Sequence, residues 1–261
     1  MNSGVTYPRG FKAAGISCGI KKNTKKDLAL IHSDSRAIAA GLFTTNKIKS
    51  ASILINLKHL RKPDAQAILI VSGNANTCTG KRGIRDSHTI VQSVADSLSL
   101  KKEEILLAST GRIGIFLPIT KIKRAIPNLV THLSEDSNSA AEAILTTDKR
   151  IKETSLATKI FGRSKREVRI GGMAKGAGMI GPNLATMLAF FTTDAVIEPA
   201  ALREALTLAV RSSFNLITID NEESTNDSAI ILANGEARNR KIKKGSENFS
   251  KFSSALNKIS L

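Results

Sequence analysis

The sequence predicts a mixed α/β protein, because short runs typical of β-strands are separated by segments with the spacing of helices. The runs are apolar and rich in β-branched residues, and Gly, Asn, Asp or Ser bound most of them, as expected of strands. They cover residues 28–31, 53–55, 67–71, 105–107, 168–170, 186–191 and 230–232. Strand and helix patterns do not alternate regularly enough to predict a barrel, and the chain has no internal repeat.

Helical spacing occurs in three segments. Ile90, Val94 and Leu98 recur every four residues and predict one helix. Pro199 is tolerated in a first helical turn, and an apolar stripe at residues 202–210 follows it. A third helix is expected just after Gly245-Ser246, with an apolar face that needs a surface to pack on and is made of Phe249, Phe252, Leu256 and Ile259.

The bulk composition is that of an ordinary soluble protein, with 261 residues, 41% hydrophobic and 23% charged. This length can bury a sizeable core as one large domain or two small ones. No apolar run is long enough to cross a bilayer, and the first residues do not have the basic-then-apolar order of a signal segment. Two cysteines are too few for a disulfide scaffold. We therefore expect a cytoplasmic protein that has no membrane partner.

The formal net charge of +17 raises the hypothesis of a nucleic-acid-binding protein. Trp is absent and only one Tyr is present, so aromatic platforms for stacking on bases are scarce. The lysines are spread along the chain, and the densest basic cluster, residues 238–244, follows a turn-like Asn234-Gly235. We favour a lysine-rich surface over a nucleic-acid site. A positive field would also attract anionic substrates.

Nucleotide and metal sites are not supported by the motifs. Residues 176–181 match G-x-G-x-x-G, but that fingerprint must open a helix, whereas Pro182-Asn183 and an extended run follow here. The same region lacks the Lys-Ser or Lys-Thr of a phosphate-binding loop. Cys78 lacks the signature of a catalytic thiol, and no two histidines have metal-ligand spacing among His32, His59, His88 and His132. We expect no metal and no bound cofactor.

Four segments are crowded with small polar residues, at positions 72–80, 108–111, 146–148 and 171–186. The first two follow predicted strands, where a glycine lets backbone N–H groups point into a cleft. Composition alone does not separate a catalytic cleft from a set of tight turns, and turns are the commoner explanation of any single segment.

Taken together, these segments resemble the ornithine acetyltransferase family, the bifunctional glutamate N-acetyltransferases of arginine biosynthesis. The most specific match is Gly171-Gly172-Met173-Ala174-Lys175-Gly176-Ala177-Gly178-Met179-Ile180, followed by Pro182-Asn183-Leu184-Ala185-Thr186-Met187-Leu188. Further matches in the same order cover nearly the whole chain, at residues 8–15, 39–46, 72–76, 108–111, 145–148, 224–227 and 233–235.

The resemblance implies a fold and a maturation step. The fold is the one that this family shares with self-processing aminopeptidases of the DmpA type, with layered sheets and flanking helices. The chain would cleave itself between Ala185 and Thr186, giving an N-terminal chain 1–185 and a C-terminal chain 186–261, with two copies of each in the assembly. An N-terminal threonine carries its own base, because its α-amine, with an ordinary pKa of ~7.7–8.0, can deprotonate the hydroxyl.

The resemblance also implies acetyl transfer by double displacement. Thr186 would take the acetyl group from N-acetylornithine, release ornithine, and pass the group to glutamate. The family's oxyanion-stabilising pair matches Thr110 and Gly111, and its substrate-binding residues match Thr147, Lys175 and Thr186. A lysine beside the nucleophile can pair with the carboxylate that both substrates possess. The residues leave open whether acetyl-CoA serves as a further co-substrate.

Two departures keep other interpretations open. Family members continue past the end of this chain with an acidic residue in a Gly-Glu-Gly-Ala-Thr-Lys-like motif, and residues 221–223 differ from the usual Gly-Asp-Thr. We therefore expect a chain truncated at its C-terminus relative to the family. A truncated or split-gene homologue would be inactive without a second piece. An N-terminal-nucleophile amidohydrolase would not need glutamate, and a nucleic-acid-binding protein would show salt-sensitive binding.

Overall fold

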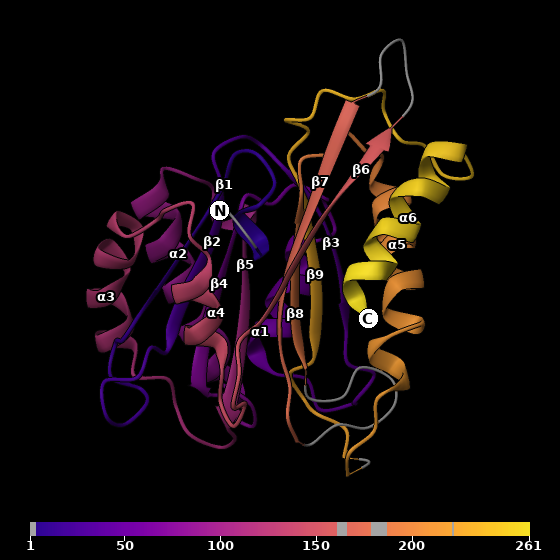
Figure 1. The fold of residues 1–261 in the computed structure, drawn as a ribbon. Coiled ribbons are helices and arrows are strands. Elements are labelled where there is room, and N and C mark those ends of the chain that lie inside the picture. The colour runs from indigo at the N-terminus through magenta and orange to yellow at the C-terminus, as the bar shows by residue number, and fades with distance from the viewer. Residues whose placement is uncertain (1–3, 161–165, 179–186, 221) are drawn as a thin grey trace.

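Two β-sheets lie face to face in the computed structural model, which describes residues 4–160, 166–178, 187–220 and 222–261 (Figure 1). Sheet A has the strand order β1 (Phe11–Ile16), β2 (Leu28–Ser33), β4 (Ala67–Asn74) and β5 (Ile105–Arg112). Sheet B has the order β3 (Ile38–Phe43), β9 (Ser228–Ala233), β8 (Leu188–Thr193), β7 (Arg166–Lys175) and β6 (Lys152–Ile160). The pairs β4–β5 and β8–β9 are parallel, and the other pairs are antiparallel.

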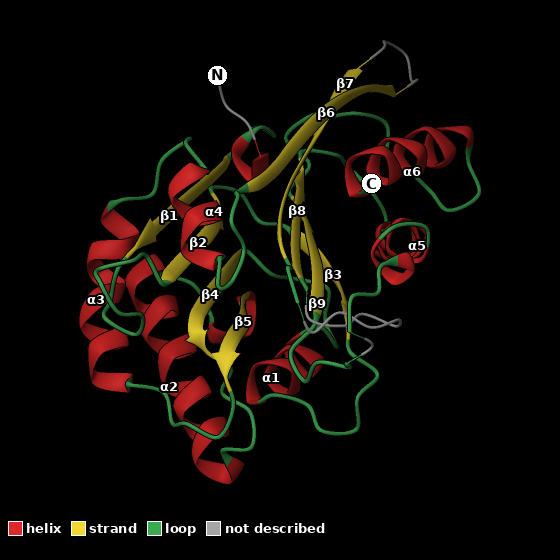
Figure 2. Ribbon diagram, turned by 60° about the horizontal axis from the view of Figure 1, so that its bottom comes forward, coloured by secondary structure: helices red, strands yellow, loops and turns green. Residues whose placement is uncertain are grey.

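Helices cover the outer faces of both sheets, so the layers run helix, sheet, sheet, helix (Figure 2). Helices α2 (Gly80–Leu98) and α3 (Ile119–Thr131) pack on sheet A, and α5 (Pro199–Arg211) and α6 (Glu247–Ser260) pack on sheet B. Helix α1 (Ala51–His59) contacts β5 and α2, whereas α4 (Asn138–Ile144) contacts β1 and β2. Short 3-10 turns lie at Gly4–Thr6, Lys102–Glu104 and Phe214–Leu216.

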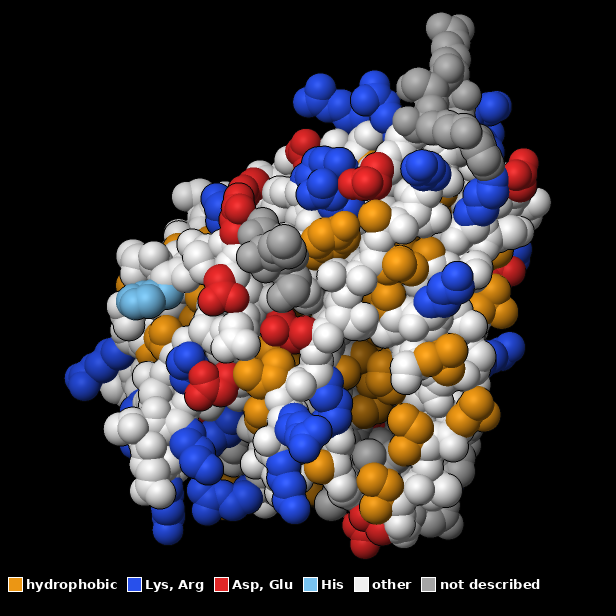
Figure 3. All heavy atoms as spheres, viewed as in Figure 1, with side chains coloured by type: hydrophobic (Ala, Val, Ile, Leu, Met, Phe, Trp, Pro, Cys, Tyr) orange, Lys and Arg blue, Asp and Glu red, His pale blue; other side chains and the backbone are white. Residues whose placement is uncertain are grey.

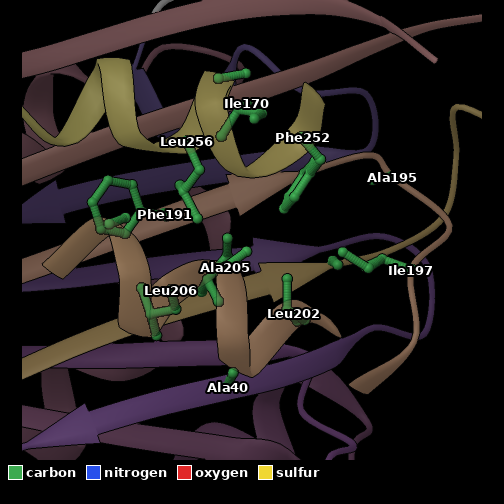
Figure 4. Close-up of a cluster of buried hydrophobic side chains, with 14 of the residues drawn as sticks. Ala40, Ile170, Phe191, Ala195, Ile197, Leu202, Ala205, Leu206, Phe252 and Leu256 are labelled. Carbon is green, nitrogen blue, oxygen red and sulfur yellow. The ribbon is translucent and has the colours of Figure 1, made fainter. Parts of the chain in front are cut away.

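Successive residues of the central strands point to different layers of the core. In β8, Phe190 is buried between the two sheets, whereas Phe191 packs under α5 and α6 with Leu206 and Phe252 (Figure 4). This alternation is the normal consequence of a strand geometry in which neighbouring side chains point to opposite faces. Both faces of these strands are buried, which explains why they appear in the sequence as continuous apolar runs.

The predicted fold class is confirmed, and most predicted elements are present. The runs at 28–31, 67–71, 105–107, 168–170 and 230–232 lie in β2, β4, β5, β7 and β9. Residues 188–191 of the predicted 186–191 strand lie in β8, whereas Thr186 is outside the described residues. The three predicted helices correspond to α2, α5 and α6. The apolar face of α6 finds its surface on α5 and sheet B, and Ser246 caps this helix by accepting a hydrogen bond from the N–H of Phe249.

The strand predicted at residues 53–55 is wrong, because these residues lie in α1. Ser50 caps this helix by accepting a hydrogen bond from the N–H of Ile53, which is 3.4 Å away. Three residues further on, Asn56 exchanges hydrogen bonds with the backbone of Leu107, and His59 bonds the carbonyl of Ile105. The helix is therefore fixed by buried polar contacts to β5, which a count of β-branched residues does not detect.

No helix among the described residues combines the length and the apolar composition needed to cross a bilayer. Lys and Arg side chains occur at the upper edge of the face drawn in Figure 3 and in a separate group over its lower part. On this face they do not form one continuous strip.

Candidate active site

A cavity of about 670 Å³ lies where the ends of β4, β5 and β7 meet. Its lining includes Thr110 and Gly111 from β5, Thr147 from the segment before β6, and Lys175 from β7. The structure thus brings together four of the site residues that the resemblance implies, although they come from strands of both sheets and from a loop. Ala185 and Thr186 lie outside the described residues.

Lys175 is the last residue of β7, and only 4% of it is exposed. Its Nζ donates hydrogen bonds to the hydroxyl of Thr110, 3.3 Å away, and to the hydroxyl of Thr146, 2.9 Å away. The first of these bonds joins sheet B to sheet A across the cavity. Lys175 is therefore a fixed, buried cation at the site and not a solvated lysine of a glycine-rich loop.

Burial and two carboxylates shift the pKa of Lys175 in opposite directions. Burial lowers the pKa of Lys175 below its ordinary value, and Asp148 and Asp227 oppose that shift by favouring the charged ammonium. Burial raises the pKa of Asp148, but hydrogen bonds from Lys152 and from the N–H of Gly176 lower it by more. The pKa of Asp148 is therefore held below its usual value. The donors lie 2.5 Å and 2.7 Å from Oδ1 of Asp148.

The end of β5 has a backbone conformation that requires glycine. Gly111 has a φ of +131°, and a Cβ atom built there would lie 2.3 Å from the carbonyl carbon of Gly73 and 2.6 Å from the nitrogen of Asn74. Gly73, its partner on β4, has a φ of +98°. A bent, glycine-rich strand end of this kind can present backbone N–H groups to an anion.

The rim of the cavity is basic. Lys21, Lys22, Lys25 and Arg112 join Lys175 in the lining, and no carboxylate occurs among its described residues. Lys21 has a structural role, because its Nζ donates to the carbonyls of Ala143 and Leu145, and burial lowers its pKa to about 8. Lys22 and Lys25 are exposed, so their ammonium groups can interact with solutes. Such a rim attracts anionic substrates.

Residues on either side of Thr186 can be placed relative to this cavity. Gly178 lines it, and Leu188 pairs with Lys175 in the antiparallel register of β7 and β8. The N–H of Met187, the residue that follows Thr186, donates to Oδ1 of Asp227 over 2.9 Å. The described residues on either side of residues 179–186 thus lie near the buried lysine.

Sequence reasoning missed some of the residues that shape the site. Thr146, rather than its predicted neighbour Thr147, bonds Lys175, although both line the cavity. Asn226 and Asp227 belong to a matched motif, but the resemblance gave them no role. A buried polar pair directly before an apolar strand is a signal that could have drawn attention to them.

The described part of the chain also bears on other chemistry. In it, no three His, Cys, Asp or Glu side chains come close enough together to hold a metal ion. Cys18 and Cys78 are free, and burial raises the pKa of the Cys18 thiol, which disfavours its reactive thiolate form.

Comparison with known proteins identifies relatives that are similar in sequence and in structure. The arginine biosynthesis bifunctional protein ArgJ of Caldanaerobacter subterraneus is 42% identical over 98% of this chain. The crystal structure of ArgJ from Bacillus halodurans has a TM-score of 0.65 at 36% identity, covering 70% of this chain and 94% of that one. The ornithine acetyltransferase of Mycobacterium tuberculosis, solved with ornithine, has a TM-score of 0.61 at 34% identity, covering 69% of this chain and 95% of that one.

The fold is also found in a more distant protein. An aminopeptidase of Ochrobactrum anthropi, described as a variant of the Ntn hydrolase fold, has a TM-score of 0.57 at 10% identity, covering 99% of this chain and 85% of that one. This likeness concerns the fold alone. The chain spans 63% of the length of the Caldanaerobacter relative. Because residues 12–261 match the ArgJ family, the chain belongs to that family.

Proposed function

We propose that this chain forms the nucleophile-bearing part of an ornithine acetyltransferase, which cleaves itself before Thr186 and moves an acetyl group from N-acetylornithine to glutamate. The observation that carries this proposal is the position of Lys175. It is buried at the cavity, bonds Thr110 of the expected oxyanion pair, and pairs with Leu188, two residues after Thr186. A buried lysine that bonds the expected oxyanion pair suits substrates that carry a carboxylate.

Self-cleavage would convert Thr186 into an N-terminal nucleophile. Its hydroxyl attacks the carbonyl carbon of Ala185, the acyl group moves from nitrogen to oxygen, and water hydrolyses the resulting ester. The products are the chains 1–185 and 186–261, and the second begins with a free α-amine that can act as the base. The match to the solved ornithine acetyltransferase covers 69% of this chain and 95% of the solved chain, so the solved chain is about as long as residues 1–185. This length supports the proposed division.

Transfer would then proceed through an acetyl-threonine intermediate. Thr186 attacks the acetyl carbonyl of N-acetylornithine, the C–N bond breaks, and ornithine leaves with the proton. The amine of glutamate next attacks the ester and restores the hydroxyl. Thr110 and Gly111 would stabilise the oxyanion of each tetrahedral intermediate, where one donor contributes about 2.7–4 kcal/mol in known acyl-transfer sites. Lys175 and Thr147 would hold the substrates.

The basic rim is consistent with anionic substrates. Lys22, Lys25 and Arg112 would raise the local concentration of glutamate, and they would also accept the phosphates of acetyl-CoA if this molecule supplies the acetyl group. No bound cofactor takes part in the scheme. We further propose that two copies of each chain assemble in the cytoplasm, which light scattering of the purified protein and cell fractionation would test.

Intact mass and N-terminal sequencing of the purified protein test the first step. We expect a fragment beginning Thr186-Met187-Leu188 in the wild type, uncut chain in Thr186→Ala, and slower cleavage in Thr186→Ser. Incubation with N-acetylornithine then separates the activities, because transfer yields acetylglutamate only when glutamate is present, whereas an amidohydrolase releases acetate without it. An uncut wild-type chain would contradict the proposal, and salt-sensitive retention of Thr186→Ala on RNA would favour nucleic-acid binding.

A further inference from the structure

Two adjacent residues directly before β9 connect the two halves of the proposed site. Asn226 and Asp227 are buried, with 6% and 1% exposed. Their side chains reach different sheets, because Asn226 contacts the ends of β4 and β5, whereas Asp227 contacts the start of β8. Neither residue has a part in the chemical steps proposed above.

Asn226 is anchored beside the expected oxyanion pair. Its Nδ2 donates to the carbonyl of Ala75 over 2.7 Å, to the carbonyl of Ser109 over 2.8 Å, and to the Ser109 hydroxyl over 3.0 Å. Its Oδ1 accepts hydrogen bonds of 2.7 Å from the hydroxyls of Thr77 and Thr225. Ser109 directly precedes Thr110, so this amide fixes the strand end that carries the oxyanion pair.

Asp227 is anchored to Met187, the residue that follows the expected nucleophile in the sequence. Its Oδ1 accepts the N–H of Met187 over 2.9 Å, and the N–H of the next residue, Ser228, donates to the carbonyl of Met187 over 3.2 Å. Met187 is therefore held on both sides of its backbone. After cleavage, the peptide bond to Met187 would be the covalent link between Thr186 and the rest of the C-terminal chain.

We propose that Asn226 and Asp227 are positioning residues that set the distance between the oxyanion pair on β5 and Met187 before β8, the residue to which the expected nucleophile is covalently joined. The inference rests on the proposed function. The Cα atoms of adjacent residues are about 3.8 Å apart, so the two anchors cannot move independently. One short dipeptide thus bonds both halves of the site, because Asn226 contacts Ser109 in β5 and Asp227 contacts Met187 directly before β8.

A carboxylate at position 227 has a second partner in the site. The negative charge of Asp227 favours the ammonium form of Lys175, and the ammonium in turn compensates a charge that would be costly to bury alone. The hydrogen bond to Met187 is a separate contribution, since a carboxamide oxygen can accept the same N–H. Asp227→Asn therefore keeps the positioning bond and removes the charge, whereas Asp227→Ala removes both.

The rate of self-cleavage of the 261-residue chain tests the inference, measured by intact mass from the moment of refolding. We expect Asp227→Ala and Asn226→Ala to cleave on the order of 100-fold more slowly, because a displacement of about 1 Å has this effect in positioned reactions. Asp227→Asn should recover most of that loss and remain within about tenfold of the wild type. This rescue by an acceptor of the same shape separates positioning from charge.

Two matched variants control for loss of stability. Asp194 is also a buried carboxylate that accepts a backbone N–H, that of Arg169 over 2.8 Å, but it follows the opposite end of β8. Asn56 bonds the same strand as Asn226 does, but at Leu107. We expect Asp194→Ala and Asn56→Ala to lower the melting temperature and to cleave at the wild-type rate.

Three results would overturn the inference. Asp227→Ala could cleave as fast as the wild type, Asp227→Asn could fail to recover the rate, or the controls could slow cleavage as much as the test variants at equal loss of melting temperature. A wild-type chain that does not cleave would overturn the proposed function and this inference together, so the two failures are distinguishable.

Discussion

Substitution of Gly111 by alanine should have a much larger effect on the rates of self-cleavage and acetyl transfer than on the stability of the folded protein. The added Cβ would lie 2.3 Å from the carbonyl carbon of Gly73, whereas ordinary van der Waals contact begins at 3.4 Å. Both atoms belong to backbone, so β5 must move away from β4 by about 1 Å. A shift of that size at a reacting centre costs on the order of 100-fold in rate. The positive φ adds strain of about 1–3 kcal/mol to the folded state.

The rates of self-cleavage and of acetyl transfer measure the effect of Gly111→Ala, and thermal unfolding measures its stability. Gly114→Ala is the matched control, because Gly114 has a φ of +78° in the following loop and no atom within 4 Å of the added Cβ. Gly114→Ala should show the loss of stability that the positive φ causes, without the displacement of β5 from β4. Cleavage of Gly111→Ala at the rate of Gly114→Ala would refute the assignment of this strand end to the site.

Three further predictions concern charge and packing. Because burial lowers the pKa of Lys175, the KM for glutamate should begin to rise at a pH below the ordinary lysine pKa of 10.5, and Lys175→Arg, which stays charged, should remove this rise. Phe252→Ala should lower the free energy of unfolding by about 3–5 kcal/mol in calorimetry, because the ring is fully buried on the inner face of α6. It should leave the cleavage rate unchanged at a temperature at which the variant stays folded. Glutamate substitution of both Lys22 and Lys25 should raise the KM for glutamate and leave kcat unchanged, whereas Lys243→Glu, exposed and outside the cavity lining, should change neither.

The elements predicted from the sequence are those with a strong apolar signal. In β4, Ile68 and Ile70 face the other sheet and Leu69 faces α2 and α3, so the whole run is apolar. Strand β1 and helix α4 were missed because their contact uses small residues. A Cβ at Gly15 of β1 would lie 1.9 Å from the carbonyl oxygen of Ser139 in α4, and such close packing has no periodic signature.

The site residues that belong to a sequence motif were predicted. Those that join the site only through tertiary contacts were missed. Thr110, Gly111, Thr147 and Lys175 were found through the resemblance, and the structure brings them to one cavity. The resemblance gave a role to Thr147 and none to Thr146. No periodicity could show that the hydroxyl of Thr146 contacts the lysine, because both residues lie outside regular elements. The partners of Asn226 at Ala75 and Ser109 are more than a hundred residues away along the chain.

The placement of the site between two sheets explains why its polar contacts are buried. Thr110 belongs to sheet A and Lys175 to sheet B, so their relative position depends on how the sheets pack, and packed sheets are about 10 Å apart. Hydrophobic contacts such as those of Ile70 and Phe190 hold the layers together but are non-directional. Hydrogen bonds from Lys175 to Thr110 and from Asn226 to Ser109 supply the direction, and burial strengthens them by excluding water. The apolar layer therefore sets the separation of the sheets, and the polar contacts fix the register of the residues proposed to react.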